Sequence, residues 1–362
     1  MLARREAHSL PVLKNSPNSQ PSAFPANPGA TPPPVRAGRV LVVQYSQTGQ
    51  QIAALDALLA PLLEAGAASG ISVHRETLRT IPAYPYPWPF WKFLDTFPET
   101  VAGDAPPLEP LTVPPGAEFD LVIIAYPVWF LSPPPALTAF LRGDDARRLL
   151  RDRPVITLTA CRNMWLMAQE KTKALLRDAG ARHCDHIALT DQGSALASFI
   201  TTPRWLLTGR KNAFWGLPAA GVSARDISGC ARFGRAILSA LRQAGEKNAG
   251  ATAPQPACAP LLAGLRACAV DGKLIASERI GIRNFRFWAK ILRACGPQGA
   301  PLRRAMLLVF TGLFFALIVT VVPASFILKT LLAPLLRKKL ARAAALYEQP
   351  SGSGGGRLAL FS

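Results

Sequence analysis

Five short apolar segments alternate with helical segments between residues 39 and 245, and this alternation constrains the fold more than any other feature. Segment 119–127 reads FDLVIIAYP, an apolar run typical of a strand covered on both faces. Helical crossovers between successive strands make those strands parallel. We therefore predict an α/β, doubly wound fold with a five-stranded parallel sheet. The strands are expected at 40–45, 71–78, 119–127, 154–159 and 186–190, and the helices at 50–69, 132–141, 163–179 and 225–241.

The segments outside this alternation differ from it in composition. Residues 1–37 are rich in Pro, Ser, Asn and Ala and lack a continuous apolar stretch, which predicts a disordered leader and no secretory signal. Stretches 81–115 and 198–222 carry clusters of Trp and Phe with Pro, and we interpret them as insertions that form lids or binding walls, or that pack locally on the sheet. The predicted division is a leader at 1–37, an α/β domain at 38–245, a basic amphipathic linker at 246–304, a membrane segment at 305–336 and a basic, Gly/Ser-rich tail at 337–362.

The positive charge of the chain is concentrated near its C-terminal end. The formal net charge is +19, of which residues 223–362 contribute +15. Such an excess favours either nucleic acid or an anionic membrane as the partner. Segment 305–328 contains no charged residue over 24 positions, enough to span a bilayer. We therefore expect a membrane partner and no nucleic acid. The alternatives left open are a single transmembrane helix, a re-entrant or monotopic insertion, and a buried soluble helix.

A second segment supports the membrane interpretation. Residues 283–294, RNFRFWAKILRA, interleave aromatic and aliphatic residues with cations, the pattern of an amphipathic helix that lies on anionic lipid. A solvated helix of a soluble domain is the alternative. Because the cations gather before the apolar segment, we expect the α/β domain to face the cytoplasm from the inner membrane.

The six cysteines show neither CxxC pairing nor the spacing of a metal site. Reduced thiols and the absence of a structural metal are therefore the expectation.

Ligands of doubly wound sheets bind beyond the carboxyl ends of the strands, where we expect three loops. The first loop offers hydroxyls and backbone N–H groups before a helix, which suits a phosphate. The second offers aromatic rings, of which Trp129 or Phe130 could stack on a planar ligand. The third brings small residues and hydrogen-bond donors to the edge of such a ring. The predicted binding residues are Ser46, Gln47, Thr48, Gly49 and Gln50 in the first loop, Pro127, Val128, Trp129 and Phe130 in the second, and Ala160, Cys161, Arg162 and Asn163 in the third.

Two residues at this edge are candidates for catalysis. Cys161 is either a packed or ligand-contacting thiol or a nucleophile, although no base accompanies it in the sequence. Asp191, in the loop after the fifth strand, is either a base or a helix cap.

The motif Ser46-Gln47-Thr48-Gly49 resembles the phosphate loop of the flavodoxin-like fold, with Gln51 where that motif usually ends in Thr. Segment 119–141 is similar to the third strand and second flavin loop of flavodoxin-like NAD(P)H:quinone reductases. The blocks FWKFLDTFPE, ITLTACRNMWLMAQEK and LTDQGSALASFITTPRWLLTGRK resemble the dialkylresorcinol condensing enzyme family, also called DarA. These resemblances imply FMN as the cofactor.

The resemblance also implies an activity. Members of that family occur with the biosynthesis of aryl polyenes and dialkylresorcinols. We expect an FMN-dependent aromatase that oxidises a lipid-like dialkylcyclohexane-1,3-dione to a dialkylresorcinol, alongside a ketosynthase partner. The alternatives are a membrane-tethered NAD(P)H:quinone oxidoreductase and a non-enzymatic lipid-binding scaffold.

Overall fold

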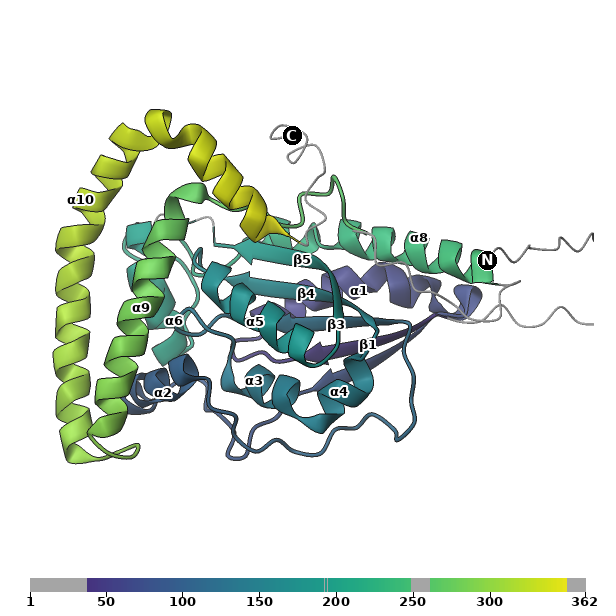
Figure 1. The fold of residues 1–362 in the computed structure, drawn as a ribbon, viewed down its shortest axis with the longest axis horizontal. Coiled ribbons are helices and arrows are strands. Elements are labelled where there is room, and N and C mark those ends of the chain that lie inside the picture. The colour runs from purple at the N-terminus through teal and green to yellow at the C-terminus, as the bar shows by residue number, and fades with distance from the viewer. Residues whose placement is uncertain (1–37, 192, 194, 249–260, 350–362) are drawn as a thin grey trace, which may run out of the picture. The chain divides into compact units, whose positions relative to one another are not determined.

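The computed structural model describes residues 38–191, 193, 195–248 and 261–349, and within them five strands form one sheet (Figure 1). All neighbouring strands are parallel, in the order β2-β1-β3-β4-β5. This is the flavodoxin-like strand order, and it confirms the predicted doubly wound fold. The strands are β1 (Arg39–Gln44), β2 (Ser72–Thr77), β3 (Leu121–Tyr126), β4 (Pro154–Cys161) and β5 (Arg182–Thr190).

Helices cover both faces of the sheet. Figure 1 shows α1 and α8 on one face and α3, α4 and α5 on the other, as the crossover rule requires. The helices are α1 (Gln50–Ser69), α2 (Phe90–Ala102), α3 (Pro135–Arg142), α4 (Asp144–Leu150), α5 (Leu166–Asp178), α6 (Ala195–Thr208), α7 (Ala224–Ser228), α8 (Ala231–Asn248), α9 (Gly272–Ala294) and α10 (Pro301–Glu348).

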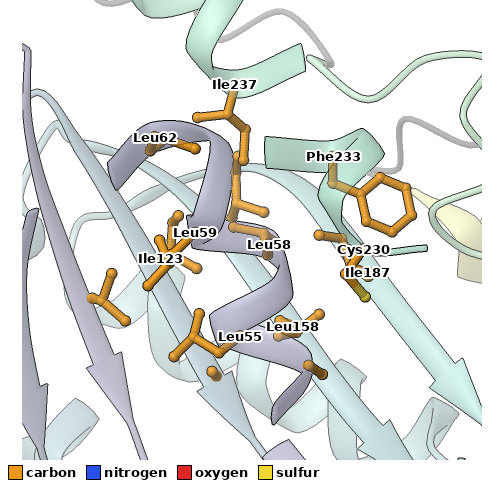
Figure 2. Packing of buried hydrophobic residues seen from close by; sticks show 14 of the residues in the cluster. Leu55, Leu58, Leu59, Leu62, Ile123, Leu158, Ile187, Cys230, Phe233 and Ile237 are labelled. Atoms are coloured by element: carbon orange, nitrogen blue, oxygen red, sulfur yellow. The ribbon is translucent and has the colours of Figure 1, made fainter. Parts of the chain in front are cut away.

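The core beneath α1 is the largest apolar cluster of the domain. Figure 2 shows Leu55, Leu58 and Leu59 of α1 between the sheet and α8. Helix α8 approaches α1 closely at Gly234, where an added Cβ would lie 1.9 Å from the carbonyl oxygen of Leu58. Only glycine permits this approach, which fixes how α8 closes the domain over α1.

Two predicted elements differ in the structure. β5 begins at Arg182, four residues before the predicted start, because buried hydrogen bonds allow the polar His183 and His186 to lie inside the sheet. The predicted helix at 225–241 is two helices, α7 and α8, separated at Gly229. The insertions at 81–115 and 198–222 contain α2 and most of α6, which the sequence patterns did not predict.

The C-terminal helices form a separate layer next to α2. Helix α9 packs against α2 and α10 through an apolar cluster that includes Phe97, Ile282, Leu292, Leu307 and Phe310. Helix α10 is continuous over 48 residues and so extends beyond the predicted segment 305–328. Among the described residues, one stretch, Pro301–Thr320, is long and apolar enough to cross a membrane.

Candidate functional site

The first predicted loop lies between β1 and α1, where the strand order reverses between β1 and β3. Gly49 takes the left-handed conformation, with φ of 79°, and its N–H donates to the Ser46 hydroxyl at 3.1 Å. No side chain caps α1, and its first turn contains no acidic residue. The N–H groups at the start of α1 are therefore available to an anion, which the helix dipole also favours.

The two glutamines of this loop turn toward the protein. Gln47 donates to the carbonyl oxygens of Tyr84 and Pro85 at 3.1 and 2.6 Å. Gln50 accepts a 2.7 Å hydrogen bond from the N–H of Val222. These contacts tie the loop to the insertions at 81–115 and 198–222, and they leave Ser46, Thr48 and backbone N–H groups as the candidate ligand-binding groups of the loop.

Gln51 occupies the position where the flavodoxin-like motif usually has Thr. Its side chain is 2% exposed, donates to the carbonyl oxygen of Leu158 at 3.0 Å and accepts from the N–H of Ala160 at 2.8 Å. Gln51 therefore joins the first loop to the third by two hydrogen bonds to the end of β4.

The second loop is a tight turn with left-handed backbone at two bulky residues. Phe130 and Leu131 have φ of 49° and 58°, and Trp129 and Ser132 exchange two backbone hydrogen bonds of 2.8 and 2.9 Å. Such a conformation costs about 1–3 kcal/mol for each non-glycine residue. The turn sends Trp129 and Phe130 in different directions, so that the two candidate stacking residues have different surroundings.

Trp129 joins a cluster of aromatic rings beside the first loop. Its ring meets those of Tyr45, Tyr84 and Trp88 at centroid distances of 5.7, 5.2 and 5.2 Å, with interplanar angles of 70–84°. Phe130 instead packs on Phe93 and Phe97 of α2, at 5.2 and 5.3 Å. Trp129, which is half-buried, is thus the ring nearer the first loop, while Phe130 belongs to the layer formed by α2, α9 and α10.

The third loop carries polar atoms that are buried without a hydrogen-bond partner. These are Nε of Arg162 and Oδ1 of Asn163. The Arg162 guanidinium lies 3.9 Å from the centre of the Phe199 ring, and burial lowers its pKa to about 10, so it stays charged at neutral pH. Buried polar groups normally have hydrogen-bond partners. The unpaired donor of Arg162 and the unpaired acceptor of Asn163 could therefore bind polar atoms at the edge of a ligand ring.

The two candidate catalytic residues lie at the same loop. Burial raises the pKa of the Cys161 thiol, which therefore stays protonated at neutral pH. Asp191 accepts hydrogen bonds from the N–H groups of Gly193 and Gly221 at 2.8 and 3.0 Å, and its own N–H donates to the Arg162 carbonyl oxygen at 2.7 Å. Asp191 thus holds the third loop against the 198–222 insertion.

The two insertions meet beside the first loop. The N–H of Trp88 donates to the carbonyl oxygen of Leu206 at 2.9 Å, which links residues 81–88 to the end of α6. Trp205 is buried, whereas Trp215 is 95% exposed at the tip of a tight turn. The insertions therefore contact each other beside the first loop, and Trp215 faces solvent.

A carboxylate that the sequence did not indicate lies behind the third loop. Glu278 of α9 is fully buried and accepts from the N–H groups of Trp165 and Met167, both at 3.1 Å, at the start of α5. Burial raises its pKa to about 7, against the opposing effect of these N–H groups. The contact joins residues 113 positions apart, so no local pattern could reveal it.

We expect Glu278→Gln to change how stability depends on pH. The Glu278 carboxyl has a higher pKa in the folded chain than in the unfolded chain, where it is about 4.3. The folded chain therefore holds the proton more tightly and is stabilised at low pH, and this contribution is lost as pH rises to 7. Between pH 5 and 8 the wild type should lose about 2–3 kcal/mol relative to Glu278→Gln. Urea denaturation across that range measures the difference. Glu64→Gln, at an exposed position of α1, is the matched control and should show no such trend.

No protein-family model and no curated protein matches the sequence. Solved structures similar to this chain include flavoproteins. A flavoprotein in complex with FMN from Lactobacillus acidophilus is 15% identical, with 42% of this chain and 93% of that one covered and a TM-score of 0.34. Oxidised flavodoxin 1 from Bacillus cereus is 12% identical, with 56% and 98% covered and a TM-score of 0.31. An NAD(P)H:quinone oxidoreductase from Methanothermobacter marburgensis is 11% identical, with 49% and 98% covered and a TM-score of 0.24.

Proposed function

We propose that this chain is an FMN-dependent oxidoreductase. The observation that carries the proposal is the uncapped start of α1 at the point where strand order reverses, the place where sheets of this order bind FMN. Ser46, Thr48 and the N–H groups around Gly49 would hold the phosphate. The unpartnered atoms of Arg162 and Asn163 would meet the flavin ring, so that the residues present fit the cofactor at both ends.

We further propose that the substrate is a lipid-like ring, a dialkylcyclohexane-1,3-dione that is oxidised to a dialkylresorcinol. The packing of the second loop supports an apolar substrate, because Phe130 and Leu131 belong to the same cluster as α9 and α10. A substrate leaving the bilayer along these helices would reach the aromatic wall around Trp129. A ketosynthase is the partner that would supply such a dione.

The reaction removes two electrons and two protons from the dione ring. Bound flavin would supply the two-electron acceptor. When a proton is removed from the carbon next to a carbonyl of the dione, Arg162 would stabilise the negative charge that develops on that carbonyl oxygen. Asp191 remains the candidate proton acceptor, since two backbone N–H donors leave lone pairs on its carboxylate. Cys161, protonated, would pack against the ring.

The proposal is tested with detergent-solubilised protein. We expect flavin absorbance bands and, on anaerobic addition of a synthetic dialkylcyclohexane-1,3-dione, bleaching of those bands with one resorcinol formed per flavin. Bleaching by NAD(P)H with reoxidation by a quinone, and no response to the dione, would instead favour a quinone oxidoreductase. Protein that neither contains nor binds FMN would contradict both activities and favour a scaffold.

Gly49→Val should weaken FMN binding by at least about tenfold, because a β-branched residue strains a left-handed backbone by about 1–2 kcal/mol and places a side chain on the phosphate loop. Gly116→Val is the matched control: Gly116 has φ of 76° and equally open surroundings but lies before β3, at the other edge of the sheet. Thr48→Ala should also weaken binding. Quenching of FMN fluorescence measures the affinity, and equal losses at Gly49 and Gly116 would show that the first loop is only a turn.

A further inference from the structure

Helix α9 and the first half of α10 lie side by side (Figure 1). Contacts between aromatic rings show which parts of the two helices are adjacent. The rings of Phe285 and Trp288 of α9 lie 6.2 and 5.5 Å from the ring of Phe310, and Phe285 lies 5.7 Å from Phe314. The middle of the apolar stretch 301–320 is therefore level with residues 285–288 of α9.

The outer face of α9 at this level is cationic. Arg283, Arg286 and Lys290 are exposed, and they flank the two rings that contact α10. A helix at the centre of a bilayer would place these charges in hydrocarbon, where they are strongly unfavourable. At the surface of an anionic membrane the same charges are attracted to lipid headgroups.

The outer face of α10 is apolar. Its exposed large residues between positions 301 and 320 have exposed fractions of 43–71% and are Leu302, Leu308, Val309, Leu313, Phe315, Leu317 and Val319. Exposed apolar surface next to a row of cations is the pattern of a helix that lies in the headgroup region and buries one face in lipid.

Both ends of α10 are attached to the same domain. Near its start, Arg303 is 1% exposed and binds Asp95 and Glu99 of α2 at 2.5 and 2.6 Å. At its end, Glu348 accepts from the N–H of Val270 at 3.1 Å, and Tyr347 packs in the cluster around Trp165 at the start of α5. A helix that crossed the bilayer would have its ends about 30 Å apart on opposite sides.

We propose that α9 and α10 hold this protein on one leaflet of an anionic membrane without crossing it, so that the end of α10 stays on the same side as the α/β domain. This selects the monotopic alternative over a transmembrane span. The inference rests on the membrane partner expected from the sequence and not on the proposed flavin chemistry, so loss of the flavin activity would leave it intact.

Sidedness is tested with two exposed positions, Ser239 on α8 and Gln349 after α10. The variants Ser239→Cys, Gln349→Cys and the double variant are reconstituted in sealed vesicles and treated with a membrane-impermeant maleimide polymer, with the unsubstituted chain as background. The readout is the number of added mass shifts per double-variant molecule, which does not depend on vesicle orientation. Both positions labelled or neither labelled is the expected result, and one label per molecule would overturn the proposal.

Lipid charge is tested by flotation of the full chain with vesicles of phosphatidylcholine, with and without phosphatidylglycerol. At about 1 kcal/mol per cation, replacing Arg283, Arg286 and Lys290 by Gln should lower partitioning to anionic vesicles roughly a hundredfold. The control replaces Arg147, Arg148 and Arg235, exposed residues of α4 and α8, by Gln and should leave partitioning unchanged. Equal losses in the two triple variants, or no flotation of the unsubstituted chain, would overturn the proposal.

Discussion

Replacing Arg303 with Met will lower the free energy of unfolding by about 3–5 kcal/mol, because it leaves two carboxylates next to α10 without their counter-ion. The Arg303 guanidinium meets Asp95 through Nε at 2.5 Å and Glu99 through Nη1 and Nη2 at 2.8 and 2.6 Å. Asp95 also accepts from the N–H of Gly299 at 2.6 Å, so the cluster holds the turn before α10 as well as its first turn.

Urea denaturation in detergent, followed by tryptophan fluorescence, measures the loss. Arg304→Met is the matched control, since Arg304 is exposed one position further along the same helix, and it should cost less than about 1 kcal/mol. Adding Asp95→Asn and Glu99→Gln to Arg303→Met should restore part of the stability, because neutral amides remove the unpaired charges. Equal losses at Arg303 and Arg304 would mean that the cluster does not anchor α10.

The alternation of strands and helices predicted the sheet well because strands that are buried on both faces consist of consecutive apolar residues, which are visible in the sequence. β3 is the clearest example, with every residue of Leu121–Tyr126 buried. β5 was predicted too short because its first half includes three polar residues, of which Asp185 and His186 are buried and His183 is partly buried. Their burial depends on partners in other strands and helices, and local patterns do not contain that information.

The sheet edge that holds the candidate site could be predicted from the topology alone, since the carboxyl ends of parallel strands share one edge. The direction in which each side chain points could not be predicted in this way. Gln51, noted in the sequence as the departure from the phosphate motif, bonds the end of β4, and Asp191 accepts hydrogen bonds from backbone N–H groups. Glu278 reaches the site from a helix that the sequence placed outside the α/β domain.

The apolar segment was recognised by length and lack of charge, which do not depend on its neighbours. Whether it crosses a bilayer depends on what lies beside it. With α9 packed at the level of Phe310, a crossing helix would bring Arg283, Arg286 and Lys290 to the bilayer centre, at about 8–10 kcal/mol by insertion scales. The register between two helices is a tertiary property, so the sequence left both topologies open.

Acidification from pH 6.5 to 4.5 will destabilise the fold by about 2 kcal/mol through His183, and by a further amount through the buried His186. The His183 and His186 rings both contact the hydroxyl of Thr157, at 2.9 and 2.8 Å. Burial lowers the pKa of His183 to about 3 and holds that of His186 well below its usual range. The His183 ring stays neutral in the folded chain at pH 4.5 but binds a proton in the unfolded chain below about 6.5, so its contribution is complete above that pH and is lost as pH falls. The lowered pKa of His186 acts in the same direction.

The pair His183→Gln and His186→Asn isolates this effect, since each amide can reach Thr157 from the position of the ring nitrogen that it replaces. Urea denaturation of the double variant should show a slope of stability against pH that is lower by at least about 1 kcal/mol per pH unit below pH 6. His74→Gln, on β2 with a ring that is one-third exposed, is the control and should keep the wild-type slope. Carboxylate protonation contributes equally to all three proteins, so an unchanged slope in the double variant would mean that these histidines do not limit stability in acid.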